Sequence, residues 1–108
     1  MGYRSHHAIV ITGTYEDWIE KARNQGLEIF EWVSPISPFS GRNQCHSFFI
    51  PPDGAEHHSE SYEGDKRRDK FIEWLKGQRY KDGSSPMEWV EVQYGDTSPE
   101  DPMVCRHS

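Results

Sequence analysis

The chain of 108 residues has few cysteines, few basic residues and no long apolar run. It has no run of about 18 to 20 apolar residues, so a membrane-spanning helix is excluded. Its N-terminus, MGYRSHH, has no apolar signal core, which predicts a cytoplasmic protein. It has only two cysteines, Cys45 and Cys105, which excludes a disulfide-stapled secreted scaffold and predicts reduced thiols. Positive charge is also scarce, and the net charge of −6 disfavours direct binding to nucleic acid phosphates.

Aliphatic residues are few as well. Ile, Leu and Val together number 14, the same as Phe, Trp and Tyr together. A domain this small buries only ~60 to 65% of its unfolded surface, so it needs large side chains to build a core. Each aromatic ring can bury ~150 to 250 Å². We therefore expect all four tryptophans in the core or at its edge: Trp18, Trp32, Trp74 and Trp89.

Four strands are indicated by β-branched and aromatic runs. Residues 9–11, IVI, form a continuous apolar run that is typical of a central strand buried on both faces. LEIFEWV at 27–33 and MEWVEVQY at 87–94 alternate between apolar and polar residues. CHSFFIP at 45–51 is nearly continuous in its apolar centre and stops at prolines. The strands are expected at residues 6–14, 27–33, 45–51 and 87–94.

Two helices are indicated by apolar residues at three- and four-residue spacing. The first is expected from Thr14 to Gly26, with a capping box of Thr14 and Asp17 and with Gly26 as the C-terminal cap. The second is expected from Asp65, a favourable N-cap, to Gln78. Loops rich in Pro, Ser and Gly or in acidic residues are expected at residues 34–44 and 53–64.

The resulting order is β-α-β-β-α-β. Right-handed crossovers fold this order most simply into a ferredoxin-like α+β domain, a four-stranded antiparallel sheet with both helices on one face. The first and third strands are expected in the centre of the sheet. Residues 1–95 are expected to form this single domain, and residues 96–108 an acidic tail without fixed structure.

Histidines and a cysteine offer one candidate site. If the first and third strands are neighbours, His7 can approach Cys45 or His46, and two histidines with a cysteine are standard zinc ligands. The same juxtaposition would allow a thiol enzyme with His7 as the base for Cys45. The chain has no CxxC or HExxH spacing, and a hydrogen-bonded histidine at a strand edge is the simpler interpretation. We predict no cofactor, with zinc as the alternative.

Anion binding is a second alternative. The chain has neither GxGxxG nor a P-loop motif, so no phosphate cradle is encoded in one segment. Arg4, Arg42 and Asn43, together with backbone amides near the strand ends, would be the ligands in an oligomeric sponge for a nucleotide signal.

Partner binding is the function that the composition favours. An acidic surface steers a partner of opposite charge, and exposed aromatic residues anchor it. The acidic candidates lie in the second loop and the aromatic candidates at strand ends or in loops. The candidate partner-binding residues are Tyr3, Phe39, Glu56, Glu60, Tyr62, Glu63 and Trp89.

The segments YRSHHAIVITG, GDKRRDKFIEWLKGQ and SSPMEWVEVQYGD resemble small, uncharacterised accessory proteins encoded by bacteriophages, over most of residues 3–96. The resemblance carries no catalytic residue onto this chain. It implies a non-enzymatic protein in the host cell cytoplasm that inhibits a host protein or nucleoprotein complex, as anti-CRISPR proteins do, or a sponge for nucleotide signals. Because small sheets with one uncovered face commonly dimerise, a homodimer is also expected.

Overall fold

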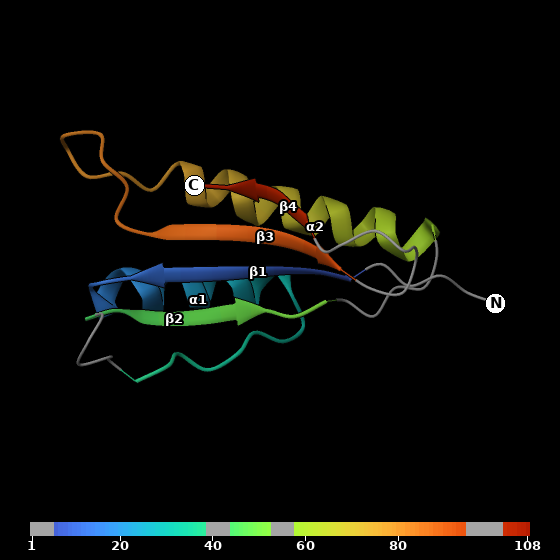
Figure 1. The fold of residues 1–108 in the computed structure, drawn as a ribbon, viewed down its shortest axis with the longest axis horizontal. Coiled ribbons are helices and arrows are strands. Elements are labelled where there is room, and N and C mark those ends of the chain that lie inside the picture. Colours follow the sequence, from blue (N-terminus) through green and yellow to red (C-terminus); the bar gives the residue numbers. More distant parts are fainter. Residues whose placement is uncertain (1–5, 39–43, 53–57, 95–102) are drawn as a thin grey trace.

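The computed structural model describes residues 6–38, 44–52, 58–94 and 103–108. They form an α+β fold of two helices and a four-stranded antiparallel sheet with the strand order β2-β1-β3-β4 (Figure 1). Within these ranges no helix is long and apolar enough to cross a membrane. The elements are β1 (His6–Gly13), α1 (Glu16–Ile29), β2 (His46–Ile50), α2 (His58–Lys76), β3 (Glu88–Tyr94) and β4 (Met103–His107).

The element order is β-α-β-α-β-β, so the predicted ferredoxin-like order is wrong. The first error lies at residues 27–33, which do not form a strand. Helix α1 continues through Gly26 to Ile29, because Ile19, Ala22, Gly26 and Ile29 extend one apolar stripe at helical spacing. Gly26 is therefore not the C-terminal cap. A Cβ there would lie 3.3 Å from Val33, so glycine lets the chain after the helix pack closely against it.

The predicted helix starts are also wrong. Helix α1 begins at Glu16 after Tyr15, which makes no side-chain capping bond, so Thr14 and Asp17 form no capping box. Helix α2 begins at His58, so Asp65 lies inside it and much of the predicted acidic loop is helical. Glutamates have high helix propensity and are favoured near a helix N-terminus, which explains why this acidic segment extends the helix.

The second topological error lies at the C-terminal end of the chain. Residues 103–107, predicted to be part of a tail without structure, form β4 and pair antiparallel with β3. Residues 95–102 lie outside the described residues. Because β4 adds to the far side of β3, β1 and β3 are the central strands. The third predicted strand, now β2, lies at the edge of the sheet.

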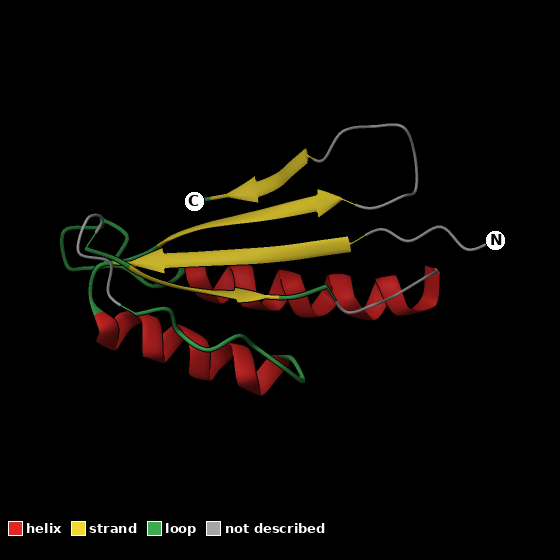
Figure 2. Ribbon diagram, turned by 60° about the horizontal axis from the view of Figure 1, so that its bottom comes forward, coloured by secondary structure: helices red, strands yellow, loops and turns green. Residues whose placement is uncertain are grey.

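The sheet has one face in the core and one open face. Ile9 and Ile11 of β1 join Phe48 and Ile50 of β2 in a single buried cluster with residues of both helices. Figure 2 shows both helices on the same side of the sheet. Val10 points to the opposite face and is 38% exposed, so the prediction that β1 is buried on both faces is wrong.

The outer edge of β2 is covered by the segment that follows α1. The N–H of Ser34 donates to the carbonyl of Phe49 and the N–H of Ser37 to that of Ser47. In return, the N–H groups of Phe49 and Ser47 donate to the hydroxyls of Ser34 (2.8 Å) and Ser37 (2.9 Å). Two serines thus complete the hydrogen bonds of an edge strand although prolines interrupt the covering segment, which blocks this edge for another strand.

A buried ion cluster holds β4 in place. The carboxylate of Glu91, 2% exposed, accepts hydrogen bonds from Nε (2.7 Å) and Nη2 (3.1 Å) of Arg106. The guanidinium of Arg68 on α2 lies 3.4 Å from the same carboxylate, and Arg106 also bonds the carboxylate of Asp69 at 2.7 Å. Glu91 therefore joins β3, β4 and α2 at one point, and its hydrogen bonds raise the pKa of Arg106 further above its ordinary value.

We predict that Glu91→Gln lowers the free energy of unfolding by about 3 to 5 kcal/mol, because it leaves the buried guanidinium of Arg68 without its carboxylate. Asp69→Asn is the matched control. It also removes one carboxylate from Arg106, but at an exposed position, and should cost less than about 1 kcal/mol. Urea denaturation of both variants tests this. Equal losses would show that the buried carboxylate has no special role.

We also predict that Ser34→Ala destabilises the protein by about 1 to 3 kcal/mol, because Ser34 is buried and its loss leaves the N–H of Phe49 without its acceptor in a partly buried hydrogen bond. Ser37→Ala removes the equivalent bond at an exposed position, where water can replace the hydroxyl, and should have a smaller effect. Amide hydrogen exchange provides the measurement. The amide of Phe49 should exchange faster in Ser34→Ala, and unchanged exchange would refute the capping role.

Candidate functional site

The structure separates the three residues predicted to form a metal or thiol site. Because β1 and β2 are antiparallel, His46 pairs with Gly13 at one end of β1, whereas His7 lies at the other end. The six positions from residue 7 to residue 13 correspond to about 20 Å at ~3.3 Å per residue. His7 therefore approaches neither Cys45 nor His46, and both predicted sites are wrong. Among the described residues, no three His, Cys, Asp or Glu side chains are grouped to hold a metal ion.

Both cysteines are free thiols. Cys105 lies in β4, not in an unstructured tail, and burial together with the nearby charge of Glu91 raises the pKa of its thiol. A raised pKa reduces the thiolate fraction at neutral pH, so Cys105 is poorly suited to act as a nucleophile.

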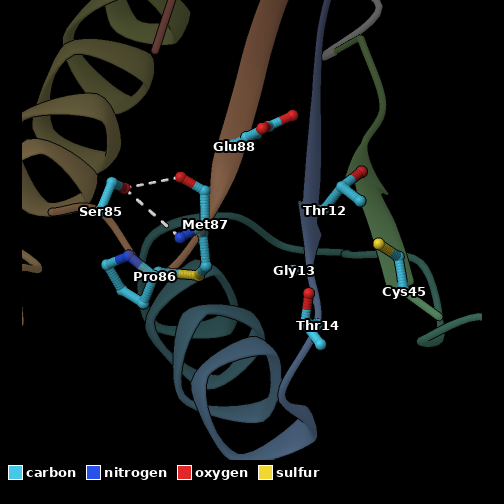
Figure 3. Close-up of a pocket in the computed structure, with 8 residues that line it drawn as sticks. All are labelled: Thr12, Gly13, Thr14, Cys45, Ser85, Pro86, Met87 and Glu88. Atoms are coloured by element: carbon cyan, nitrogen blue, oxygen red, sulfur yellow. Dashed lines mark hydrogen bonds between the residues drawn. The ribbon is translucent and has the colours of Figure 1, made fainter. Parts of the chain in front are cut away.

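A small pocket lies where β1 ends and β3 begins (Figure 3). Its volume is about 190 Å³. On its wall, the hydroxyl of Ser85 donates to the carbonyl of Met87 at 2.6 Å. Sites for drug-sized ligands usually enclose about 300 to 1,000 Å³, so a nucleotide exceeds this space. The pocket is lined by Thr12, Gly13, Thr14, Cys45, Ser85, Pro86, Met87 and Glu88.

Most of the predicted binding residues cannot be placed. The side chains of Glu60, Tyr62 and Glu63 are not described, although all three belong to α2. Trp89 can be placed, and it is wrong as a binding residue: only 6% of it is exposed because its side chain points into the core. The predicted residues that lie outside the described ranges are Tyr3, Arg4, Phe39, Arg42, Asn43 and Glu56.

The tryptophans divide between core and surface. Trp18 and Trp74 are half-buried against the core cluster, as predicted. Trp32 was also expected there, but it is 54% exposed. It follows α1 in an irregular segment and contacts Phe49 edge-to-face, with ring centroids 6.1 Å apart. Trp32 therefore has the mixture of exposure and support by a neighbouring ring that is typical of binding anchors.

Helix α1, which ends shortly before this tryptophan, carries exposed acidic residues on its outer surface. At 100° per residue, Asp17, Glu20 and Glu28 lie on the side of the helix opposite its buried stripe, and all are exposed. Leu27, 43% exposed, lies on the same side, and Glu31 follows the helix. We call these residues, with Trp32, the α1 acidic face: Asp17, Glu20, Leu27, Glu28, Glu31 and Trp32.

The cations of α1 are engaged with other groups of the protein. The ammonium of Lys21 lies 5.1 Å from the centre of the Trp18 ring, which itself contacts Tyr80. The guanidinium Nε of Arg23 donates to the carbonyl of Ser34 at 2.8 Å. Lys21 and Arg23 keep their charge in these contacts, but the four acidic residues of α1 outnumber its two basic ones, so the helix carries net negative charge.

Sequence reasoning missed the α1 acidic face because it assigned residues 27–33 to a strand. That assignment separated Glu28 and Trp32 from Asp17 and Glu20 and placed the tryptophan in the core. The available signal was the helical spacing of Ile19, Ala22 and Ile29, which continues past Gly26.

Comparison of the chain with protein-family models, with curated proteins and with solved structures finds no match. No matched protein therefore supplies a function for this chain.

We predict that zinc chloride added in equimolar amount leaves the melting temperature unchanged, because ligands about 20 Å apart along a strand cannot close one site. Differential scanning fluorimetry provides the measurement. A rise in melting temperature that disappears in both His7→Ala and His46→Ala would restore the metal hypothesis.

Proposed function

We propose that this protein is a non-enzymatic binding protein and that the α1 acidic face contacts its partner. The observation that carries the proposal is the half-exposed ring of Trp32 shortly after α1, together with the exposed carboxylates on the outer side of that helix. A partner with a basic surface fits this arrangement, because opposite charge steers the encounter and a central aromatic residue supplies much of the binding energy.

The position of Glu28 supports a role in binding over a role in stability. It lies near the C-terminal end of α1, where the last turn has no basic residue. The negative end of the helix dipole makes a carboxylate unfavourable at such a position, by about 0.3 to 1 kcal/mol. Glu16 and Asp17, by contrast, lie in the first turn, where negative charge stabilises the helix. A carboxylate in an unfavourable position is expected where contact with a partner requires it.

The partner in this proposal is a host protein or nucleoprotein complex in the cytoplasm of a bacterial cell, whose activity the binding inhibits. Two considerations favour it. The sequence resembles accessory proteins of phages, and the basic surfaces of proteins that bind nucleic acid complement an acidic face. The nucleotide-sponge alternative has no comparable support from the described residues.

We predict that Glu20→Lys, Glu28→Lys, Trp32→Ser reduces capture of the partner by at least about tenfold, because it removes both steering charge and the aromatic anchor. The measurement is quantitative mass spectrometry of host proteins that co-purify with the tagged protein expressed in bacterial cells. The inhibited activity should recover in parallel.

The matched control replaces two exposed carboxylates outside both α1 and the sheet, Glu73→Lys and Asp82→Lys, so that net charge changes equally. It should capture the same host proteins as the unaltered chain. If both variants lose the same proteins, binding follows net charge alone and the α1 acidic face is not the contact surface. If neither loses them, the proposal is wrong.

A further inference from the structure

The open face of the sheet forms an apolar surface on the side away from both helices. Because paired strand residues project to the same face, the registers place Val10 between Phe49 and Val90, and Val92 beside Val104. Phe49 is 42% exposed and Val104 54% exposed, and Val90 and Val92 are half-buried. Figure 2 shows no described helix on this side. We call this surface the valine face: Val10, Phe49, Val90, Val92 and Val104.

We propose that the valine face is the contact surface between two copies of this chain, packed sheet against sheet as a homodimer. This inference does not depend on the proposed function, although the two surfaces meet where the ring of Trp32 contacts Phe49. In such a dimer the helices lie on the outside, so the carboxylates of α1 remain accessible.

The distribution of charge favours a second copy as the occupant. The chain carries a net charge of −6, so two copies repel each other unless their contact avoids acidic residues. On the open face the described ionisable positions are His6, Glu88, Tyr94 and His107. Each lies at the end of its strand, and His107, on the edge strand β4, pairs with Val90. The centre is uncharged, which matches an apolar interface core with a polar rim. A partner recognised by its basic charge would find no carboxylate in this centre.

The size of the face approaches what a dimer needs. The four strands have 8, 5, 7 and 5 residues, and at ~4.8 Å between strands and ~3.3 Å per residue they give a footprint of about 20 Å by about 20 Å. Two facing footprints amount to about 800 Å² before the relief of the side chains is counted, and that relief has to supply the rest of the roughly 1,000 Å² that a specific interface requires. Two sheets that stack face to face in this way lie about 10 Å apart, and their apolar side chains interdigitate between them.

The edges of the sheet favour face-to-face packing over extension of the sheet. The outer edge of β2 is covered by Ser34 and Ser37. The β4 edge is short, contains a bulge opposite Glu91 and Val92, and carries Arg106 turned inward to the ion cluster. Short strands, bulges and inward charges are features that prevent edge-to-edge pairing. The valine face lacks such features.

The test measures mass in solution by light scattering or native mass spectrometry over a concentration series from about 1 μM to about 100 μM. The unaltered chain should give twice its monomer mass of 12.6 kDa at the upper end. Val10→Glu should weaken the dimer at least about tenfold, since it places a carboxylate in the centre of the contact. The matched control is Leu27→Glu, which replaces an equally exposed apolar residue on α1 and should remain dimeric.

Val104→Glu, on the edge strand, repeats the test at a position where a charge disturbs folding less, and circular dichroism verifies the fold of each variant. If the mass corresponds to a monomer at every concentration, the proposal is wrong, and the valine face would then contact a partner other than a second copy of the chain. A dimer that survives in folded Val10→Glu or Val104→Glu also overturns it, because the interface then lies elsewhere. The host-capture variants leave all five residues of the valine face unaltered, and because Trp32 contacts Phe49 their mass in solution is measured as well, which separates a loss of the partner from a loss of the dimer.

Discussion

The carboxylate of Glu91 between Arg68 and Arg106 is the interaction on which the rest of this structure depends. It lies under α2, at the pairing of β3 with β4, in a position that would be intolerable for an unpaired charge. Because three elements contribute to one cluster, displacement of β4 removes two hydrogen bonds from the buried carboxylate, and displacement of β3 takes that carboxylate away from Arg68. The cluster therefore fixes β4 as the fourth strand and makes β3 central.

The position of β4 has consequences for the surface of the molecule. With β3 in the centre, Val90 and Val92 lie between β1 and β4 and extend the apolar surface that Val10 and Phe49 begin. Both helices contribute to the core on the opposite side. The molecule thus presents two chemically different surfaces, an apolar sheet face and an acidic helix face. A protein with this division can associate with itself on one side and with a basic partner on the other.

The predicted elements succeeded where local pattern and tertiary packing agree. The strands at His6–Gly13, His46–Ile50 and Glu88–Tyr94 were expected from their β-branched and aromatic runs, and they form. The prediction failed at residues 27–33, where strand-like alternation competes with the helical stripe of α1, and packing of Val33 against Gly26 decides for the helix. It failed again at residues 103–107, where backbone pairing with β3 and the charge of Glu91, both distant in sequence, stabilise a strand. These two errors account for the wrong order of elements and for the missed α1 acidic face.

The sequence by itself determined an acidic α+β protein with few aliphatic residues, a core that uses aromatic rings, and two free cysteines, because composition and local periodicity depend on the chain alone. Tertiary structure alone decided which face of each strand is buried, that His7 lies far from His46, and that Trp89 is in the core while Trp32 is on the surface. Those outcomes follow from strand direction and register, which are set by contacts between residues far apart in the sequence. Strand direction is the feature that separates two possible zinc ligands by the length of a strand and gathers four valines on one face.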